Sequence, residues 1–127
     1  MIVGTGVDIA EVDRIAASIK RFGGRFTERV FTRDEIRYCE SKANKAERYA
    51  ARFAAKEAGM KAIGTGWKHG VTWHDIEVRR APGGRPTIVF SRKAAEFFDK
   101  LGATKAHLSL THTAEFAVAQ VILEDGN

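Results

Sequence analysis

The sequence has little cysteine and little proline. Cys39 is the only cysteine, and there are two prolines among 127 residues. A lone cysteine cannot form an internal disulfide, which excludes a small scaffold held by internal disulfides and favours a reducing compartment. We interpret Cys39 as a structural thiol on a helix; a nucleophilic role is the less favoured alternative.

Signals for membrane insertion or export are also lacking. No apolar run approaches the roughly 20 residues that span a bilayer. The N-terminal segment is apolar in part but has no basic leader and no cleavage pattern, so we do not expect a signal peptide. Internal repeats, low-complexity segments and linkers are missing as well. We therefore expect one domain over residues 1–127 of a cytoplasmic protein without a membrane partner.

The composition is otherwise that of a globular protein with an excess of positive charge. Hydrophobic residues make up 44% and charged residues 29%, which argues against disorder. The formal net charge is +5 and the sequence pI is about 9.6. Such an excess implies an anionic partner. Nucleic acid, an acidic protein and a phosphorylated cofactor all fit, and composition does not choose among them.

Hydrophobic periodicity and turn residues predict an α+β domain. Thr32 followed by Glu35 has the spacing of a capping box, which predicts a helix start there. Pro82 to Gly84 predicts a turn between two strands. The order strand, three helices, hairpin, helix, hairpin favours a small, mostly antiparallel sheet with packed helices. The predicted elements are a strand over 1–8, a helix over 11–21 ended by Gly23 and Gly24, a helix from Thr32 through Cys39, a helix over 46–63, strands over 72–80 and 87–90, a helix after Ser91, and strands over 107–111 and 116–123.

A carboxylate follows the first predicted strand in Gly6-Val7-Asp8-Ile9. A carboxylate beside a glycine at a strand end is well placed to face a cleft. Hard cations such as Mg²⁺ bind oxygen ligands and often take only one or two from the protein. Asp8 alone is equally explained as the cap of the next helix, which is the simpler interpretation.

Charged residues are spaced along the helix predicted over 46–63. Glu57 and Lys61 are four residues apart and share one face, and Arg52 and Lys56 are four apart on a neighbouring face. One carboxylate among three cations suits a metal ion bound to a diphosphate. The alternative is a solvated face of Glu–Lys pairs, which the helix alone favours.

Two further segments have residues that bind phosphate. Gly64-Thr65-Gly66 follows this helix, and its glycines let the backbone approach a ligand, although a helix stop explains them as well. The segment has no Gly-Lys-Ser/Thr and is not a Walker loop. Ser109 to Thr113 includes His112 beside hydroxyls, which suits phosphate binding or proton transfer. The hydrolase pattern G-x-S-x-G is absent, and no Cys/His cluster predicts zinc.

Basic residues recur near the N-terminus with aromatic residues between them. Arg14 and Arg21 are seven apart on one helix face, and Arg25 follows, with Phe22 and Phe26 interleaved. Such a helix can dock nucleic acid or an acidic helix. A solvated basic face is the alternative.

Taken in order, these motifs resemble the holo-acyl-carrier-protein synthase family, the short bacterial class of phosphopantetheinyl transferases. The resemblance covers essentially the whole chain, and the Lys-Glu-Ala…Lys-Ala…Gly-Thr-Gly stretch is its most specific part. Thr111 stands where the family often has serine and keeps the hydroxyl, and Ser18 stands where relatives can carry a larger apolar residue. The segments that carry the resemblance are Gly6–Ile9, Arg52–Ala58, Lys61–Gly66, Gly84–Pro86 and Leu108–Thr113.

The resemblance implies transfer of 4′-phosphopantetheine from coenzyme A to a serine of an acidic apo acyl carrier protein, in support of fatty acid biosynthesis. It implies a homotrimer with sites at the subunit interfaces and no nucleic-acid partner. The base stays open among Asp8, Glu57 and a metal-bound water. The implied roles are Mg²⁺ ligands for Asp8 and Glu57, a phosphate contact for Lys61, a coenzyme cradle for Arg52, Gly64, Thr65 and Gly66, closure over the nucleotide from a neighbouring subunit for Arg85, Pro86, Ser109 and His112, and carrier docking for Arg14, Arg21 and Arg25.

Two other classes of function remain as alternatives. A basic nucleic-acid-binding module explains the net charge and the interleaved aromatic residues, but it leaves the arrangement of Glu57, Lys61 and the Gly64–Gly66 turn unexplained. A metal-dependent nucleotide hydrolase uses the same carboxylates, with water as the nucleophile.

Overall fold

The computed structural model describes all of residues 1–127, and its helices and strands confirm the α+β class. The chain forms one strand, four helices, a hairpin, a fifth helix and a second hairpin. One turn of 3₁₀ helix, η1 (Trp73–Asp75), precedes the first hairpin. The other elements are β1 (Ile2–Glu11), α1 (Val12–Phe22), α2 (Gly24–Val30), α3 (Arg33–Glu40), α4 (Lys45–Ile63), β2 (Ile76–Arg80), β3 (Pro86–Phe90), α5 (Arg92–Lys100), β4 (Lys105–His112) and β5 (Phe116–Glu124).

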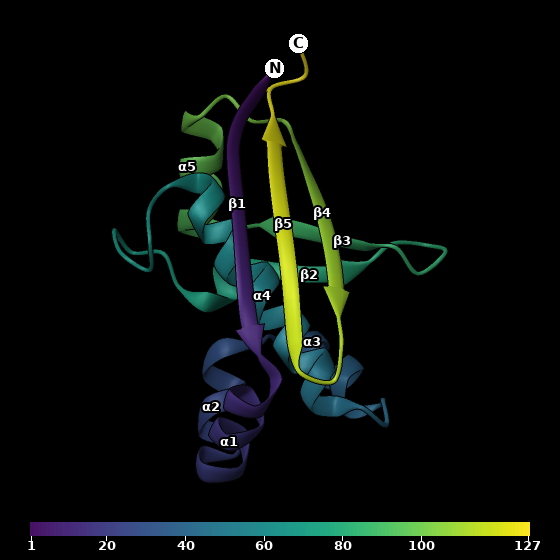
Figure 1. Ribbon diagram of the computed structural model, residues 1–127. Helices are drawn as coiled ribbons and strands as arrows, with labels where there is room; N and C mark the ends of the chain where they lie inside the picture. Colours follow the sequence, from purple (N-terminus) through teal and green to yellow (C-terminus); the bar gives the residue numbers. More distant parts are fainter.

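The strands form two antiparallel sheets. One sheet has the order β1-β5-β4, and β2 pairs with β3 in the other. In Figure 1 the three-stranded sheet lies in front, α4 runs behind it, and the β2–β3 hairpin crosses at the back. Both chain ends lie at one end of this sheet, and α1 and α2 lie beyond the other. None of the helices is at once long and apolar enough to cross a bilayer.

Two local expectations were wrong. Gly23 does end α1 with a positive φ of 56°, but Gly24 begins a further helix, α2, instead of a loop. The strand expected over 72–80 begins only at Ile76. The Asp75 carboxylate accepts a hydrogen bond from the Thr72 backbone N–H at 3.2 Å, which closes the 3₁₀ turn before the strand. A side-chain hydrogen bond therefore overrides the alternating pattern there.

Helix α4 is the centre of the core, and seven of its 19 residues are alanine. Five of its alanines are 0–2% exposed, and their short side chains let both sheets approach the helix. Gly59 has the same role toward the hairpin: a Cβ there would lie 2.8 Å from Ile88 Cδ1. Gly59 therefore marks a close contact between the helix and the hairpin. The five alanines are Ala50, Ala51, Ala54, Ala55 and Ala58.

Two glycines of β1 bring the strand against α4. A Cβ on Gly6 would lie 2.0 Å from the carbonyl oxygen of Ala58, and a Cβ on Gly4 would lie 2.4 Å from that of Ala62. No side chain fits at these distances, so only glycine permits this approach. The consequence is that Asp8, two residues beyond Gly6, lies beside the last turns of α4.

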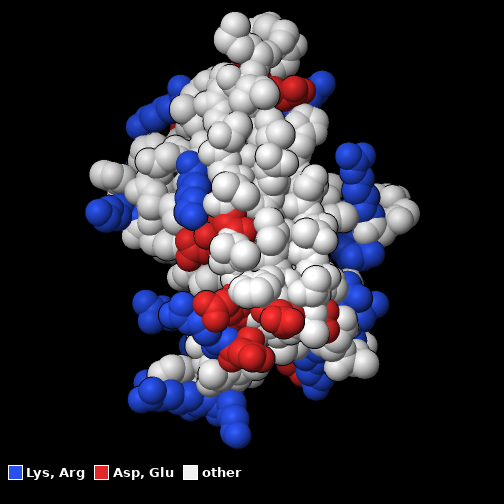
Figure 2. All heavy atoms as spheres, in the orientation of Figure 1, with Lys and Arg blue, Asp and Glu red and all other residues white.

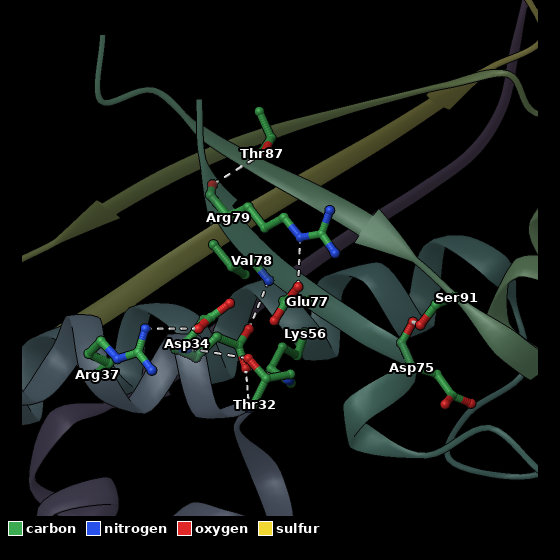
Figure 3. Close-up of polar contacts among 11 residues, drawn as sticks. Thr32, Asp34, Arg37, Lys56, Asp75, Glu77, Val78, Arg79, Thr87 and Ser91 are labelled. Atoms are coloured by element: carbon green, nitrogen blue, oxygen red, sulfur yellow. Dashed lines mark hydrogen bonds and ion pairs between the residues drawn. The ribbon is translucent and has the colours of Figure 1, made fainter. Parts of the chain in front are cut away.

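A buried ion pair fixes the opposite side of α4. Lys56 Nζ lies 2.7 Å from Glu35 Oε1, and both side chains are fully buried. The same carboxylate accepts backbone N–H groups from Thr32 at 2.8 Å and from Val78 at 2.7 Å (Figure 3). Burial lowers the pKa of Lys56 from its ordinary value, and Glu35 opposes that effect. Because every oxygen of Glu35 is engaged, the pair joins α3, α4 and β2.

We expect Gly6→Ala to weaken the fold. The added Cβ overlaps the backbone of α4, so the strand or the helix must move, at a cost of about 1–3 kcal/mol or more. Gly24→Ala is the matched control, because the nearest atom to a Cβ there is 3.7 Å away. Urea denaturation measures both variants. Equal free energies of unfolding for the two would refute the close β1–α4 contact.

Candidate active site

Asp8 and Lys61 form an ion pair where β1 meets the end of α4. Lys61 Nζ lies 2.9 Å from Asp8 Oδ1 and also donates to the Val7 carbonyl oxygen at 3.2 Å. The Asp8 side chain is 17% exposed and that of Lys61 is 48% exposed, so the pair borders solvent. Asp8 points toward α4 because it shares the alternation of Gly6 along β1. It does not cap α1, whose N-cap is Glu11, so that alternative is excluded.

Glu57 lies one turn before Lys61 and close to the same pair. Its Oε1 accepts a hydrogen bond from Trp67 Nε1 at 3.2 Å. Burial raises the pKa of the Glu57 carboxyl; the Trp67 hydrogen bond opposes this rise, the charge of Asp8 adds to it, and Lys61 opposes it. The structure therefore brings Asp8, Glu57 and Lys61 together, as the sequence predicted.

These three side chains have the chemistry of a small divalent-cation site. One oxygen of each carboxylate accepts from Lys61 or Trp67, and no protein group hydrogen-bonds to the other. A depression of about 200 Å³, lined in part by Asp8 and Lys61, opens beside them. No group of three or more His, Cys, Asp or Glu side chains forms a metal cluster. Two carboxylates suit a hard cation such as Mg²⁺, which takes its other ligands from water and phosphate.

Lys56 does not belong to this group. The sequence pattern counted Arg52, Lys56 and Lys61 as cations around Glu57, but Lys56 is fully buried in its pair with Glu35. Lys56 lies on the side of α4 that packs against α3 and β2, so it cannot reach a phosphate. The expectation of three cations around Glu57 was wrong.

The Gly64–Gly66 segment turns the chain after α4. Gly64 ends the helix with a φ of 79°, and Gly66 also has a positive φ, of 63°. Thr65 is buried and its hydroxyl donates to the Gly66 carbonyl oxygen at 2.8 Å. These two turns fold the chain back so that the Trp67 side chain contacts Glu57. Trp67 was not predicted to take part in the site, although an aromatic residue directly after a glycine turn can be a signal for such a return.

Arg52 lies on another side of α4, in what we call the basic pocket. Its guanidinium lies 3.9 Å from the centre of the Tyr38 ring. The residue is 3% exposed, its Nε has no hydrogen-bond partner, and burial lowers its pKa. An orphaned buried donor among cations fits a missing anion. The pocket, of about 160 Å³, is lined by Tyr38, Arg48, Ala51, Arg52, Arg80, Pro86, Leu110 and His112.

The four residues expected to close over the nucleotide do not lie together. Pro86 and His112 line the basic pocket, and His112 Nδ1 lies 3.0 Å from Glu47 Oε1. Arg85 is exposed in the turn before β3. Ser109 is exposed on the opposite face of the three-stranded sheet, since it alternates with Leu108 and Leu110 along β4. Arg48 and Arg80, which the sequence did not single out, add to the positive charge of this pocket.

That opposite face, which we call the outer face, is apolar. Val7 and Ile9 are 59% and 61% exposed on β1, and Phe116 is 43% exposed on β5. Strand pairing places Val118 next to Ile9, and Gln120 between Val7 and Ser109. In Figure 2 much of the front of this sheet carries no charged side chain. Large apolar side chains gathered on one face are typical of a protein–protein contact.

The basic residues near the N-terminus lie on α1 and α2. Arg14 and Arg21 are on α1, and Arg25 is on α2. All three are exposed; Arg14 lies 3.8 Å from Glu11, and Arg21 lies over the Phe22 ring. Figure 2 shows blue side chains at the lower end of the molecule, where these helices lie. We call this the basic end.

Two other features do not take part in these sites. One of these is a depression of about 750 Å³ between α2, α3 and the hairpin, where Arg79 pairs with Glu77 and Arg92 pairs with Asp75. Cys39 is fully buried, and burial raises the pKa of its thiol to about 12. A thiol that is neither accessible nor ionised is not a nucleophile.

Comparisons with known proteins agree on one family. A sequence profile of the 4′-phosphopantetheinyl transferase superfamily matches residues 4–121. A holo-[acyl-carrier-protein] synthase of Koribacter versatilis is 67% identical over 125 residues, which cover 98% of this chain and 100% of the relative.

Solved structures agree with the sequence comparison. The crystal structure of the holo-[acyl-carrier-protein] synthase from Neisseria meningitidis matches with a TM-score of 0.88 at 31% identity, covering 98% of this chain and 99% of that one. The synthase from Bacillus anthracis, in complex with CoA (3′,5′-ADP), matches with a TM-score of 0.81 at 40% identity, covering 99% of each chain. The chain belongs to the 4′-phosphopantetheinyl transferase superfamily and, within it, to the holo-[acyl-carrier-protein] synthases.

Proposed function

We propose that this chain transfers the 4′-phosphopantetheine group of coenzyme A to a serine of an apo acyl carrier protein. The observation that carries the proposal is the meeting of Asp8, Glu57 and Lys61 at the junction of β1 and α4. Two carboxylates beside an ammonium suit a metal-bound diphosphate, and family membership names the diphosphate as coenzyme A. Residues 1–127 act as one catalytic domain, because both sheets pack on α4.

Asp8 and Glu57 hold Mg²⁺ in this proposal. When bound, the cation neutralises charge on the diphosphate. Lys61 adds a second positive charge, which stabilises the transferring group or the leaving oxygen as the bond to it breaks. We call Asp8, Glu57 and Lys61 the metal half of the site.

The carrier's serine is the nucleophile, so the protein supplies none. The serine hydroxyl forms a bond to the β-phosphorus of coenzyme A, its proton passes to a base, and the bond to adenosine 3′,5′-bisphosphate breaks. Asp8 and Glu57 are the carboxylates that the proposed site offers as this base. Such a transfer depends mainly on positioning and on neutralising charge. The burial of Cys39 supports a nucleophile supplied by the carrier, because this chain has no other thiol.

The basic pocket takes the nucleotide end of coenzyme A. Besides the diphosphate, coenzyme A carries a phosphate on its ribose, and the orphaned Nε of Arg52 lies among Arg48, Arg80 and His112. Arg85 and Ser109 lie outside this pocket, and in this proposal they complete the cradle from a neighbouring subunit. In this proposal Arg52 therefore acts with His112 and not with Glu57.

A homotrimer brings the two halves together. The metal half lies at β1, an edge strand of its sheet, and the adjacent outer face carries Val7, Ile9 and Phe116 exposed. Covering this face with a second copy removes apolar surface from water. It also allows the basic pocket of one subunit to meet the metal half of the next.

The basic end receives the carrier. Acyl carrier proteins are acidic, and Arg14, Arg21 and Arg25 are exposed beside Phe22. Charge complementarity of this kind mainly speeds association and orients the partner. The product, holo carrier, serves fatty acid biosynthesis in the cytoplasm, and the free thiol of Cys39 is compatible with that reducing compartment.

Removing a metal ligand should abolish transfer without unfolding the protein. We expect Asp8→Asn and Glu57→Gln to lower kcat/KM by roughly 100-fold or more at millimolar Mg²⁺. Mass spectrometry of an apo carrier incubated with coenzyme A measures the gain of phosphopantetheine. Glu96→Gln, an exposed change on α5, is the matched control. Folded variants that keep full activity would sink the assignment of both ligands.

The basic end and Lys61 should give different kinetic signatures. Arg14→Ala and Arg21→Ala should raise KM for the carrier and weaken its dependence on salt, because they remove charges that attract an acidic partner. Lys61→Gln should instead lower kcat, because its charge acts on the reacting phosphate. Arg37→Ala on α3 is the control. The same change of KM and kcat in both classes would contradict this separation.

Mixing two inactive variants tests whether sites are shared between subunits. Asp8→Asn spoils the metal half and His112→Ala spoils the basic pocket. Co-expressed at equal amounts, they should recover roughly a quarter of wild-type activity. In randomly assembled trimers, about a quarter of the interfaces combine an intact metal half from one subunit with an intact basic pocket from the next. Light scattering checks the trimer. No recovery from mixed trimers would mean that each site lies within one subunit.

A further inference from the structure

Trp67 makes a hydrogen bond to Glu57 that the transfer reaction as proposed does not explain. The indole Nε1–H donates to Glu57 Oε1 at 3.2 Å, across ten residues of chain. The contact exists because Gly64 and Gly66, both with positive φ, fold the chain back after α4. An indole N–H only donates, so a carboxylate is a suitable partner for it.

Two other aromatic rings hold this indole in place. Trp67 stacks on Trp73 with ring centroids 4.0 Å apart and an interplanar angle of 29°. Trp73 in turn lies 5.1 Å from the ring of Phe53, which is on α4. The row Phe53–Trp73–Trp67 therefore starts from the same helix that carries Glu57. Stacking of this kind fixes the position of the N–H relative to that helix.

The two carboxylates of the metal half are restrained in the same way. Lys61 binds one oxygen of Asp8, and Trp67 binds one oxygen of Glu57. In each case the second oxygen has no hydrogen bond from the protein. A glutamate has several side-chain torsions, so without Trp67 the Glu57 carboxylate can adopt many positions. Groups that hydrogen-bond to a metal ligand commonly set its orientation in this manner.

We propose that Trp67 is a positioning residue, whose indole N–H fixes the Glu57 carboxylate so that its second oxygen meets a divalent cation. This inference rests on the proposed role of Glu57 as a metal ligand. It assigns Trp67 no contact with substrate and no part in proton transfer.

The direct test is Trp67→Phe in the full-length protein. Phenylalanine keeps an aromatic ring against Trp73 but removes the N–H donor together with part of the stacked ring. We expect the dissociation constant for Mn²⁺, measured by electron paramagnetic resonance with saturating coenzyme A, to rise about tenfold. The binding of Mn²⁺ to coenzyme A alone is subtracted. The midpoint of thermal unfolding should stay within a few degrees of wild type.

Trp73→Phe is the matched control. It shrinks an aromatic ring of the same row but keeps a ring against Trp67 and leaves the N–H donor in place, so Mn²⁺ affinity should fall much less than in Trp67→Phe. Kinetics should separate in the same way: Trp67→Phe raises the Mg²⁺ concentration needed for half-maximal rate, while kcat at saturating Mg²⁺ changes little. Equal losses of Mn²⁺ affinity in the two variants would overturn the inference, because they would point to packing and not to the N–H.

A measurement on the unmutated residue does not depend on how the variants fold. The indole N–H resonance of Trp67, assigned by its loss in Trp67→Phe, should move when Mg²⁺ and coenzyme A are added. In Glu57→Gln it should not respond to Mg²⁺. A resonance that stays still while wild-type protein binds Mg²⁺ would overturn the inference.

The metal site and the role of Trp67 are tested separately by these variants. If Glu57→Gln binds Mn²⁺ as well as wild type does, the metal site itself is wrong and the role of Trp67 falls with it. If Glu57→Gln loses Mn²⁺ but Trp67→Phe keeps full affinity, the metal site stands and only the role of Trp67 is wrong.

Discussion

The contact of β1 with α4 through glycine is the constraint on which the candidate site depends. A Cβ on Gly6 or Gly4 would overlap carbonyl oxygens of the helix, so the strand lies directly on the helix backbone. Asp8 lies on the same side of the strand and forms an ion pair with Lys61. Any side chain at position 6 would push the strand away from the helix and separate Asp8 from Lys61. The chemistry at Asp8 therefore depends on the absence of a side chain two residues earlier.

Helix α4 carries several functions because each of its sides meets a different neighbour. Lys56 is committed to Glu35 and joins α3 and β2 to the helix. Gly59 admits Ile88 of the hairpin. Glu57 and Lys61 face β1, and Arg52 lies in the basic pocket. The alanines between them allow this crowding, since longer side chains would separate the layers. Different sides of one helix therefore carry the residues that stabilise the fold and the residues of the candidate sites.

Much of this could be predicted from sequence, and the limits have physical causes. The helix over 46–63 and the capping box at Thr32 were predictable because they depend on local periodicity and local hydrogen bonds. The α2 helix was missed because a glycine pair indicates a stop and gives no sign of a restart. Asp8, Glu57 and Lys61 were grouped through the family resemblance, and the structure shows them close together. Lys56 was misplaced because spacing does not reveal which side of a helix is buried. Trp67 was missed because its partner lies ten residues away across two left-handed glycines.

The positions of Arg52 and Glu57 on one helix make a second subunit part of the proposed mechanism. They are five residues apart, which at 3.6 residues per turn separates their directions by about 140° around the axis. Within one copy, the two side chains therefore leave the helix in different directions. The metal half combines two carboxylates with one ammonium and attracts a cation, while the basic pocket has an orphaned donor among arginines and attracts an anion. Two copies that meet at the apolar outer face can offer these opposite charges to the two ends of one substrate. In the proposed mechanism, a single copy therefore leaves each half incomplete.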